Sequence, residues 1–295
     1  MSDFILKEKT RTLAGEITPP GDKSISHRAV ILGSLGRGKT KASGFLASQD
    51  TLATANAFRS MGIEVEVGAG GVEIAGRGLF GLKEPRKTID AENSGTTARL
   101  LTGVLSAQSF PSTITGDDSL RRRPMSRVTV PLRSMGARIS GEGEVLPLHI
   151  TGSELQGIDY RSPVASAQVK STILLAGLYA AGRTSVTELE RTRDHTERML
   201  RYFGVPVQVS GTRVSVSQGM EFSGTELEIP SARRWPHRSH SPSRPPRPRS
   251  PLPPRRVSRR TGSGSTSCSG RARRSFPAGS RRRSGPGCGR GALWR

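Results

Sequence analysis

The pattern of hydrophobic and polar positions repeats three times between positions 1 and 230. In each copy a helical stretch ends at a glycine (Gly62, Gly136 or Gly204), and an alternation of apolar and polar residues follows at once. Glycine in that place is typical of the left-handed residue that ends a helix. The three glycines recur at nearly equal intervals, so the pattern predicts three similar structural units in succession.

Each unit is predicted to hold the same order of elements. An earlier helix begins at Ser24, at Thr96 and near Ser166, and each unit closes with two alternating runs joined by a glycine-rich turn. Because this period is too long for a thin solenoid, we expect the units to close around a common axis, with the helices inside and the sheets outside or the reverse. The chain is thus placed in the α/β (α+β) class, as β-α-β-α-β-β units over about 21–82, 88–153 and 160–229.

The repeating pattern stops at Pro230. Residues 231–295 contain 18 Arg and no Lys, Asp or Glu, whereas the part of the chain before them carries a net charge of only +4. Such a segment cannot bury enough apolar surface to offset its conformational entropy, so we predict that 231–295 is disordered. The abrupt loss of Lys, Asp and Glu favours a segment translated out of frame over a natural basic tail.

The part of the chain that ends at Pro230 excludes several classes of protein. Both cysteines lie after it, so this part has neither a disulfide framework nor a thiolate metal site. The longest apolar stretch, 173–181, is too short to span a membrane, and the charged N-terminus lacks the apolar core of a signal peptide. We therefore expect a cytoplasmic protein that does not associate with membranes.

The strongest candidate for chemistry is the stretch Pro20-Gly-Asp-Lys-Ser-Ile-Ser-His-Arg28. Several of its residues can cap a helix, and an apolar run of helical length follows. Lys23, Ser24 and Arg28 are therefore expected at or within the first turns of a helix, where free backbone N–H groups and the positive dipole end point outward. This arrangement predicts a site for a phosphorylated or carboxylated small molecule. The alternative is a well-capped helix that carries two ordinary surface cations.

The second and third units offer similar groups at their own helix starts. Gly95 would let a ligand approach the backbone closely, and Arg123, held extended by Pro124, could clamp a carboxylate with two hydrogen bonds. Ser166 can cap the third helix, and Gln168 can hydrogen-bond a hydroxyl group. The alternative is again structural: capped helices and a solvated run of arginines.

Five motifs occur along this part of the chain: Pro20-Gly-Asp-Lys-Ser-Ile-Ser-His-Arg28, Asn93-Ser-Gly-Thr-Thr-Ala-Arg99, Arg123-Pro-Met125, Ser166-Ala-Gln168 and Arg193-Asp-His-Thr-Glu-Arg-Met-Leu200. In their order and spacing they resemble the 5-enolpyruvylshikimate-3-phosphate synthase family. The resemblance covers residues 1 to about 230, and roughly the second half of the family's chain is missing. It implies two similar domains of three units each. In that scheme 1–20 is a strand that belongs with the missing second domain, 21–229 is one whole substrate domain, and 231–295 is an unrelated tail.

The resemblance also implies roles for single residues. Lys23 would act in catalysis, and the site would need no metal and no cofactor. Ala167 stands where some relatives have a second serine, and a residue bulkier than Gly95 would exclude the inhibitor glyphosate. Shikimate 3-phosphate would be bound by Lys23, Ser24, Arg28, Ser166 and Gln168. Phosphoenolpyruvate would be bound by Lys23, Gly95, Arg123 and Gln168.

The implied activity is that of a transferase in the shikimate pathway, which leads to chorismate and the aromatic amino acids. The reaction transfers the enolpyruvyl group of phosphoenolpyruvate to the 5-hydroxyl of shikimate 3-phosphate and releases phosphate. Because the family's catalytic Asp and Glu lie in the missing domain, we expect this chain to be inactive or to bind only. We also expect a monomer whose partners are the two small-molecule substrates.

Three other interpretations stay open on the residues alone. A UDP-N-acetylglucosamine enolpyruvyl transferase has the same fold and chemistry, although the Gly-Asp-Lys-Ser and Ser-Ala-Gln motifs suit the shikimate enzyme. The Arg-rich tail could bind nucleic acid, but without interleaved aromatic residues only non-specific, salt-sensitive binding is expected. The chain could also be an inert, degraded remnant.

Overall fold

The computed structural model describes residues 19–219 and 221–231. The predicted strand within 1–20 and the predicted disordered tail 231–295 therefore lie outside the described residues, apart from positions 19, 20 and 231. Among the described residues no helix is long and apolar enough to cross a membrane.

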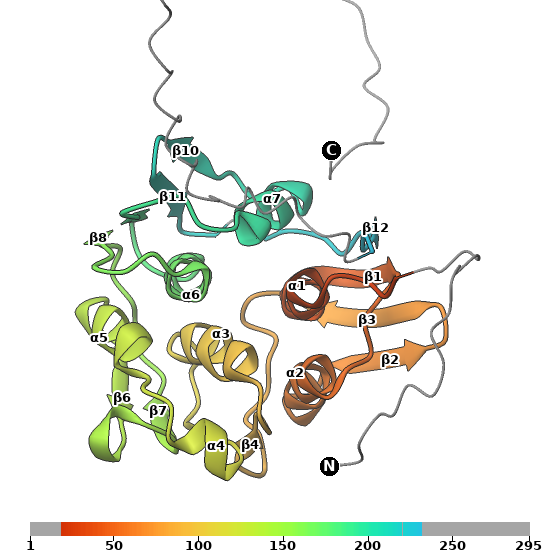
Figure 1. Cartoon of the computed structure of the whole chain (residues 1–295), viewed down its shortest axis with the longest axis horizontal. Coiled ribbons are helices and arrows are strands. Elements are labelled where there is room, and N and C mark those ends of the chain that lie inside the picture. The colour runs from red at the N-terminus through yellow and green to blue at the C-terminus, as the bar shows by residue number, and fades with distance from the viewer. Residues whose placement is uncertain (1–18, 220, 232–295) are drawn as a thin grey trace, which may run out of the picture. The chain divides into compact units, whose positions relative to one another are not determined.

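Three units of similar structure follow one another along the chain, which confirms the predicted α/β class (Figure 1). The first contains α1 (Lys23–Leu35), β1 (Arg37–Ser43), α2 (Gln49–Ser60), β2 (Glu64–Gly68) and β3 (Gly71–Arg77). The second contains β4 (Ile89–Asp90), α3 (Gly95–Leu105), β5 (Ser112–Thr115), α4 (Asp118–Arg121), α5 (Ser126–Ser134), β6 (Arg138–Ser140), a 3₁₀ turn (Glu142–Glu144) and β7 (Leu148–Thr151). The third contains β8 (Asp159–Arg161), α6 (Ala167–Gly177), β9 (Arg183–Thr187), α7 (His195–Tyr202), β10 (Gln208–Ser210) and β11 (Arg213–Ser217).

The end of the last α-helix in each unit confirms the glycine pattern predicted from the sequence. Gly62, Gly136 and Gly204 have φ values of +83°, +97° and +86°. A residue with a side chain rarely adopts this left-handed conformation, whereas glycine does so without strain. The chain can therefore turn from each helix directly into the strand that follows.

Each unit has its own four-stranded sheet, and the strand order is the same in all three. The orders are β4-β5-β7-β6, β8-β9-β11-β10 and β12-β1-β3-β2. In the second and third units the first strand of this order also comes first in the sequence. In the first unit its place is taken by β12 (Glu226–Glu228), which pairs in parallel with Lys41–Ser43 of β1.

The complete first unit predicted at 21–82 thus needs a correction. Its edge strand comes from the far end of the described residues, and Ile229 N–H donates to Ser43 O at 2.9 Å next to this pairing. A parallel pairing between segments so distant in sequence leaves no local pattern, because only tertiary contacts select the partner.

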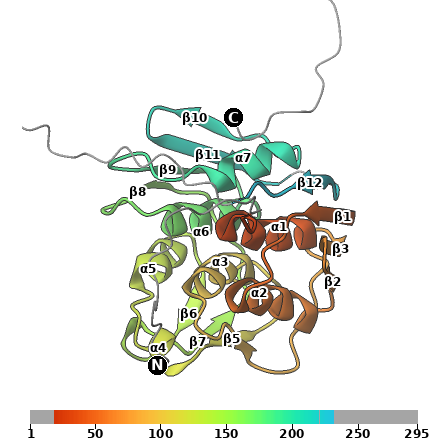
Figure 2. The same ribbon diagram turned by 45° about the vertical axis from the view of Figure 1, so that its right-hand side comes forward.

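The helices lie inside and the sheets outside, which decides between the two expected arrangements (Figures 1 and 2). The central helix α1 is buried at every position from Ile25 to Leu35, in keeping with its nearly continuous apolar sequence. The helices α3 and α6 approach closely at Gly103, where an added Cβ would come within 2.5 Å of the carbonyl oxygen of Thr172. Larger side chains would force these two helices apart.

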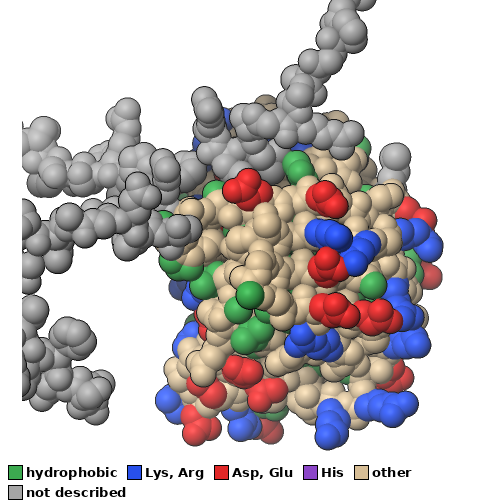
Figure 3. Space-filling model, turned by 90° about the vertical axis from the view of Figure 1, so that its right-hand side faces the viewer, with side chains coloured by type: hydrophobic (Ala, Val, Ile, Leu, Met, Phe, Trp, Pro, Cys, Tyr) green, Lys and Arg blue, Asp and Glu red, His purple; other side chains and the backbone are tan. Residues whose placement is uncertain are grey.

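The outer face of the first sheet is polar and mixed in charge. Figure 3 shows basic and acidic side chains interspersed on this side of the molecule. Among the described residues, Lys39 and Lys41 pair with Glu73, and Arg77 lies 3.7 Å from Glu64. Exposed pairs of this kind add little stability. The charged residues instead keep this side of the sheet hydrated, while its other side covers the helices.

The position of β12 leads to a stability prediction. Leu227 is 8% exposed, so the change Leu227→Asp would bury an unpaired carboxylate or detach the strand. We expect the free energy of unfolding to fall by about 2–4 kcal/mol, measured by urea denaturation. Glu228→Gln, at an exposed position of the same strand, is the matched control and should unfold like the unaltered chain. Equal urea midpoints for Leu227→Asp and the unaltered chain would contradict the assigned role of β12.

Candidate functional site

The start of α1 places three predicted site residues on one helix. Asp22 caps the helix, because its carboxylate accepts a hydrogen bond from the backbone N–H of Ile25 at 2.9 Å. Lys23 and Ser24 follow in the first turn, and Arg28 lies one turn further on. The unpaired N–H groups and the positive dipole end of this helix favour an anion.

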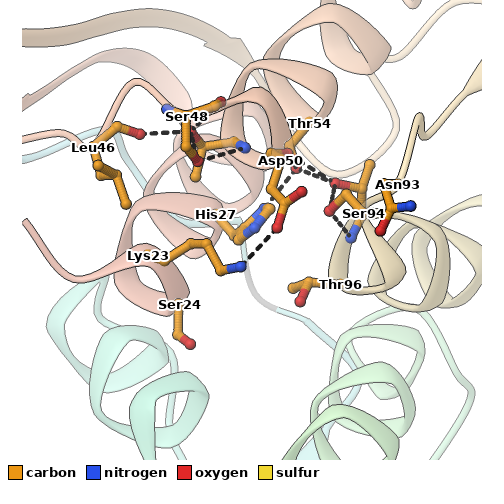
Figure 4. A network of polar contacts seen from close by, with 12 residues as sticks. Lys23, Ser24, His27, Leu46, Ser48, Asp50, Thr54, Asn93, Ser94 and Thr96 are labelled. Atoms are coloured by element: carbon orange, nitrogen blue, oxygen red, sulfur yellow. Dashed lines mark hydrogen bonds and ion pairs between the residues drawn. The ribbon is translucent and has the colours of Figure 1, made fainter. Parts of the chain in front are cut away.

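Lys23 faces the carboxylate of Asp50, which the sequence analysis did not predict as a site residue. Its Nζ donates to Asp50 Oδ2 at 2.6 Å, and the side chain of Lys23 is 52% exposed (Figure 4). Asp50 lies in the first turn of α2, which Ser48 caps. Exposed ion pairs contribute only about 0.2–1 kcal/mol, so an incoming anion could replace Asp50 as the partner of Lys23 at small cost.

Arg28 is almost completely buried, with 5% of its surface exposed. Its Nη1 donates to the carbonyl oxygen of Ser24 at 2.8 Å, its Nε to Thr196 Oγ1 at 2.6 Å, and its Nη2 to Ser171 Oγ at 2.8 Å. Burial lowers the pKa of the guanidinium to about 10. Arg28 therefore stays positively charged at neutral pH while neutral oxygens hold it in place.

The start of α3 brings Gly95 next to two arginines. Ser94 caps this helix, two residues before the predicted start at Thr96. A Cβ added at Gly95 would lie 2.7 Å from Nη1 of Arg99 and 3.5 Å from Nη1 of Arg123. A side chain at this position would displace the guanidinium of Arg99, whereas Arg123 would be in ordinary van der Waals contact with it. Glycine therefore leaves Arg99 in its present position and keeps the backbone here open to a ligand.

Asn93 holds Arg123 in this place. Arg123 Nη2 donates to the side-chain oxygen of Asn93 at 2.6 Å, and Asn93 Nδ2 donates to Asp117 at 2.6 Å. Arg123 is thus not a solvated arginine of the 121–123 run but part of a fixed hydrogen-bonded chain. Asn93 and Arg123 lie in two separate sequence motifs, and no local sequence pattern indicated that they would be in contact.

The start of α6 connects to α3 through Gln168. Ser166 caps α6 as predicted, with the N–H of Val169 donating to its Oγ. Gln168 Nε2 donates to Thr96 Oγ1 at 2.9 Å, and Gln168 Oε1 accepts from Arg99 Nη1 at 3.0 Å. Gln168 and Gly95, predicted from separate motifs, therefore share Arg99 as a neighbour.

Polar contacts connect the first turns of all three central helices. The start of α1 reaches α6 through Arg28, α3 reaches α6 through Gln168, and Thr97 Oγ1 donates to the backbone oxygen of Asp50 in α2 at 3.2 Å. Arg193, which lies just before α7, donates to Ser24 Oγ at 3.4 Å. Arg193 is exposed beside these groups. The sequence analysis included it in a motif but did not predict this contact with Ser24.

A buried chain of hydroxyl groups supports this region from behind. His27 Nδ1 lies 2.7 Å from Thr54 Oγ1, Thr54 Oγ1 lies 2.7 Å from Thr97 Oγ1, and Thr97 Oγ1 lies 2.7 Å from Ser94 Oγ (Figure 4). Burial, with a smaller effect from the charge of Arg28, lowers the pKa of His27 to about 3. The imidazole is therefore neutral at neutral pH. Among the described residues no group of three or more His, Cys, Asp or Glu could hold a metal ion.

Comparison with known proteins shows the family to which the chain belongs. Residues 7–233 match the protein-family model described as EPSP synthase (3-phosphoshikimate 1-carboxyvinyltransferase). The chain belongs to the EPSP synthase family. This confirms the resemblance drawn from the five motifs.

Relatives in the EPSP synthase family cover the same part of the chain. A 3-phosphoshikimate 1-carboxyvinyltransferase of Methylococcus capsulatus is 57% identical over 222 residues, which is 74% of this chain and 51% of the relative. That of Bacillus subtilis is 50% identical over 226 residues, 76% of this chain and 53% of the relative. The solved EPSP synthase of Acinetobacter baumannii superimposes with a TM-score of 0.72 and 53% identity, over 74% of this chain and 50% of that structure. The chain thus spans about half the length of the relatives it matches.

The neutral, buried His27 generates a pH prediction. Its pKa is lowered from 6.5 to about 3, so between these values the unfolded chain binds a proton that the folded chain does not. The stability that His27 contributes is present above pH 6.5 and is lost as the pH falls, by about 1.4 kcal/mol per pH unit. We expect His27→Gln to remove this slope from urea-unfolding free energies measured between pH 6.5 and pH 4.

The matched control is His149→Gln, because His149 is exposed and lies far from α1 in the sequence. This variant should keep the slope of the unaltered chain. Identical slopes for His27→Gln and the unaltered chain would show that His27 is not the group that titrates on unfolding.

Proposed function

We propose that this chain binds shikimate 3-phosphate and phosphoenolpyruvate at the connected starts of α1, α3 and α6. The observation that carries the proposal is the joining of three capped helix starts, with Lys23, Arg28 and Arg123 beside them, through the contacts of Gln168 and Arg28. Both molecules are anions, and positive helix ends together with charged donors are what phosphate and carboxylate groups bind.

The proposed contacts divide between the two ligands. Gly95 lies beside both Arg99 and Arg123, which supports the assignment of Gly95 and Arg123 to the smaller ligand, and Gln168 contacts Arg99 as well. Shikimate 3-phosphate is held by Lys23, Ser24, Arg28, Ser166 and Gln168. Phosphoenolpyruvate is held by Lys23, Gly95, Arg123 and Gln168.

The proposed reaction is that of the relatives' printed name, a 3-phosphoshikimate 1-carboxyvinyl transfer. A proton adds to carbon 3 of phosphoenolpyruvate while the 5-hydroxyl oxygen attacks carbon 2 and loses its own proton, which gives a tetrahedral intermediate. Loss of a proton from carbon 3 and of phosphate from carbon 2 then leaves the enolpyruvyl ether. Lys23, which we assign to catalysis, and the arginines stabilise the negative charge of both anions and of the intermediate.

These residues supply the positive charges that would bind the two anions, but they do not include a carboxylate that could act as acid or base. The match to the family ends at residue 233, and residues 231–295 contain no Asp or Glu. We propose that 21–229 is the substrate domain, that 1–20 is a strand that belongs with a second domain, and that a second domain provides the remaining carboxylates. We expect the protein to act as a monomer in the cytoplasm.

Binding can be tested directly by calorimetry with shikimate 3-phosphate. We expect Lys23→Ala to weaken binding about tenfold or more, since a hydrogen bond to a charged group is worth about 1.5–3 kcal/mol. Lys39→Ala is the matched control, because Lys39 is an exposed lysine that pairs with Glu73 on the outer sheet face. Equal affinities of the Lys23→Ala variant and the unaltered chain would refute the assignment. Tighter binding of UDP-N-acetylglucosamine than of shikimate 3-phosphate would point to the other acceptor.

Turnover is expected to be low for this chain alone. Loss of an acid or base typically costs about 10²–10⁴-fold in rate per proton-transfer step. We expect phosphate release from the two substrates to be reduced at least by this factor relative to the Bacillus subtilis enzyme, assayed side by side. Comparable rates for the two proteins would show that this chain already contains a complete catalytic set.

A further inference from the structure

Two neighbouring residues on α6 face two neighbouring residues on α7. Lys170 Nζ lies 2.6 Å from Glu197 Oε1 and 2.7 Å from Glu188 Oε2, and all three side chains are at most 3% exposed. Directly beside this ion pair, Ser171 Oγ lies 2.7 Å from Thr196 Oγ1. The two helices are therefore joined by an ionic and a hydroxyl contact one residue apart (Figure 2 shows α6 and α7 next to α1).

Arg28 of α1 donates hydrogen bonds to both members of this hydroxyl pair. Its Nε donates to Thr196 and its Nη2 to Ser171, and these two residues are each 1% exposed. A guanidinium has five N–H donors. Three take part in the hydrogen bonds found among the described residues, including the bond to Ser24 O. Two N–H groups remain, and the three hydrogen bonds hold the side chain in one orientation.

The three hydrogen-bond partners of Arg28 are neutral oxygens. Hydroxyl and carbonyl oxygens orient the cation without forming an ion pair with it, so these contacts leave its charge for a ligand. The nearby carboxylate of Glu197 attracts the guanidinium and partly offsets the effect of burial on its pKa. The Oε1 atom of Glu197, however, is bound to Lys170.

We propose that Ser171 and Thr196 are positioning residues, whose hydroxyl pair orients the Arg28 guanidinium toward the bound ligand. This inference rests on the proposed function, in which Arg28 is one of the residues that hold shikimate 3-phosphate. The preset orientation avoids the loss of rotational freedom that a flexible arginine would undergo on binding. Neither residue touches the ligand in this proposal.

The test compares conservative changes at Thr196 in the full chain. Thr196→Val keeps the shape and removes the hydroxyl, and we expect calorimetry with shikimate 3-phosphate to show about tenfold weaker binding. Thr196→Ser restores the hydroxyl and should bind within about twofold of the unaltered chain. Thr184→Val is the matched control. Thr184 is fully buried and its Oγ1 has no hydrogen-bond partner in the described part of the chain, so the affinity of this variant should not change.

A second measurement needs no ligand. In nitrogen-15 spectra of arginine-labelled protein, the Nε–H signal of Arg28, assigned by its loss in Arg28→Lys, should exchange slowly with water. Thr196→Val should make it exchange fast, and Thr196→Ser should keep it slow. A merely structural role would lower thermal stability and leave this signal and the affinity unchanged.

The possible outcomes separate the two proposals. Unchanged affinity in Thr196→Val, or equal losses in Thr196→Val and Thr196→Ser, would overturn the positioning role while the proposed function stands. Equal affinities of Arg28→Ala and the unaltered chain would overturn the proposed function and this inference with it.

Discussion

The positive ends of three helices lie together in this fold, and the hydrogen bonds that hold them there determine much of the remaining structure. Helix ends of like charge repel each other. Three sets of polar contacts oppose this repulsion: the chain from His27 to Ser94, the seat of Arg28 on Ser171 and Thr196, and the bonds of Gln168 to Thr96 and Arg99. The apolar faces of the helices pack around these contacts, and the three sheets cover the outside. The repeated unit therefore serves mainly to deliver a capped helix start to one place.

The same contacts explain why the region is suited to anions. A cation that is buried among neutral oxygens, as Arg28 is, keeps its charge, and its lowered pKa of about 10 records the cost of that burial. Lys23 differs, because it is exposed and has Asp50 as a partner that is easily replaced. Arg28 is thus held in place, whereas Lys23 can exchange its partner Asp50 for another anion. An anion that binds both would relieve repulsion that the folded chain otherwise contains.

The sequence predicted what local chemistry determines. The cap at Ser166 and the left-handed glycines at 62, 136 and 204 follow from single residues and their neighbours, and the structure agrees. Asp50, Arg193 and the seat of Arg28 could not be found in this way. Asp50 meets Lys23 from the next helix, and Thr196 meets Arg28 from the third unit, and only the packing of the helices brings such residues together. The edge strand of the first sheet was missed for the same reason.

That edge strand also affects the order in which the protein can form during synthesis. The first unit to leave the ribosome lacks the strand beside β1 until positions 226–228 have been made, whereas the other two sheets are each built from continuous sequence. Until then β1 presents an unpaired edge, which is a site for pairing with the wrong partner. Its basic residues, Arg37, Lys39 and Lys41, would discourage such pairing between nascent chains, since like charges would meet. The sheet whose strands are synthesised first is therefore the last of the three to receive its full set of strands.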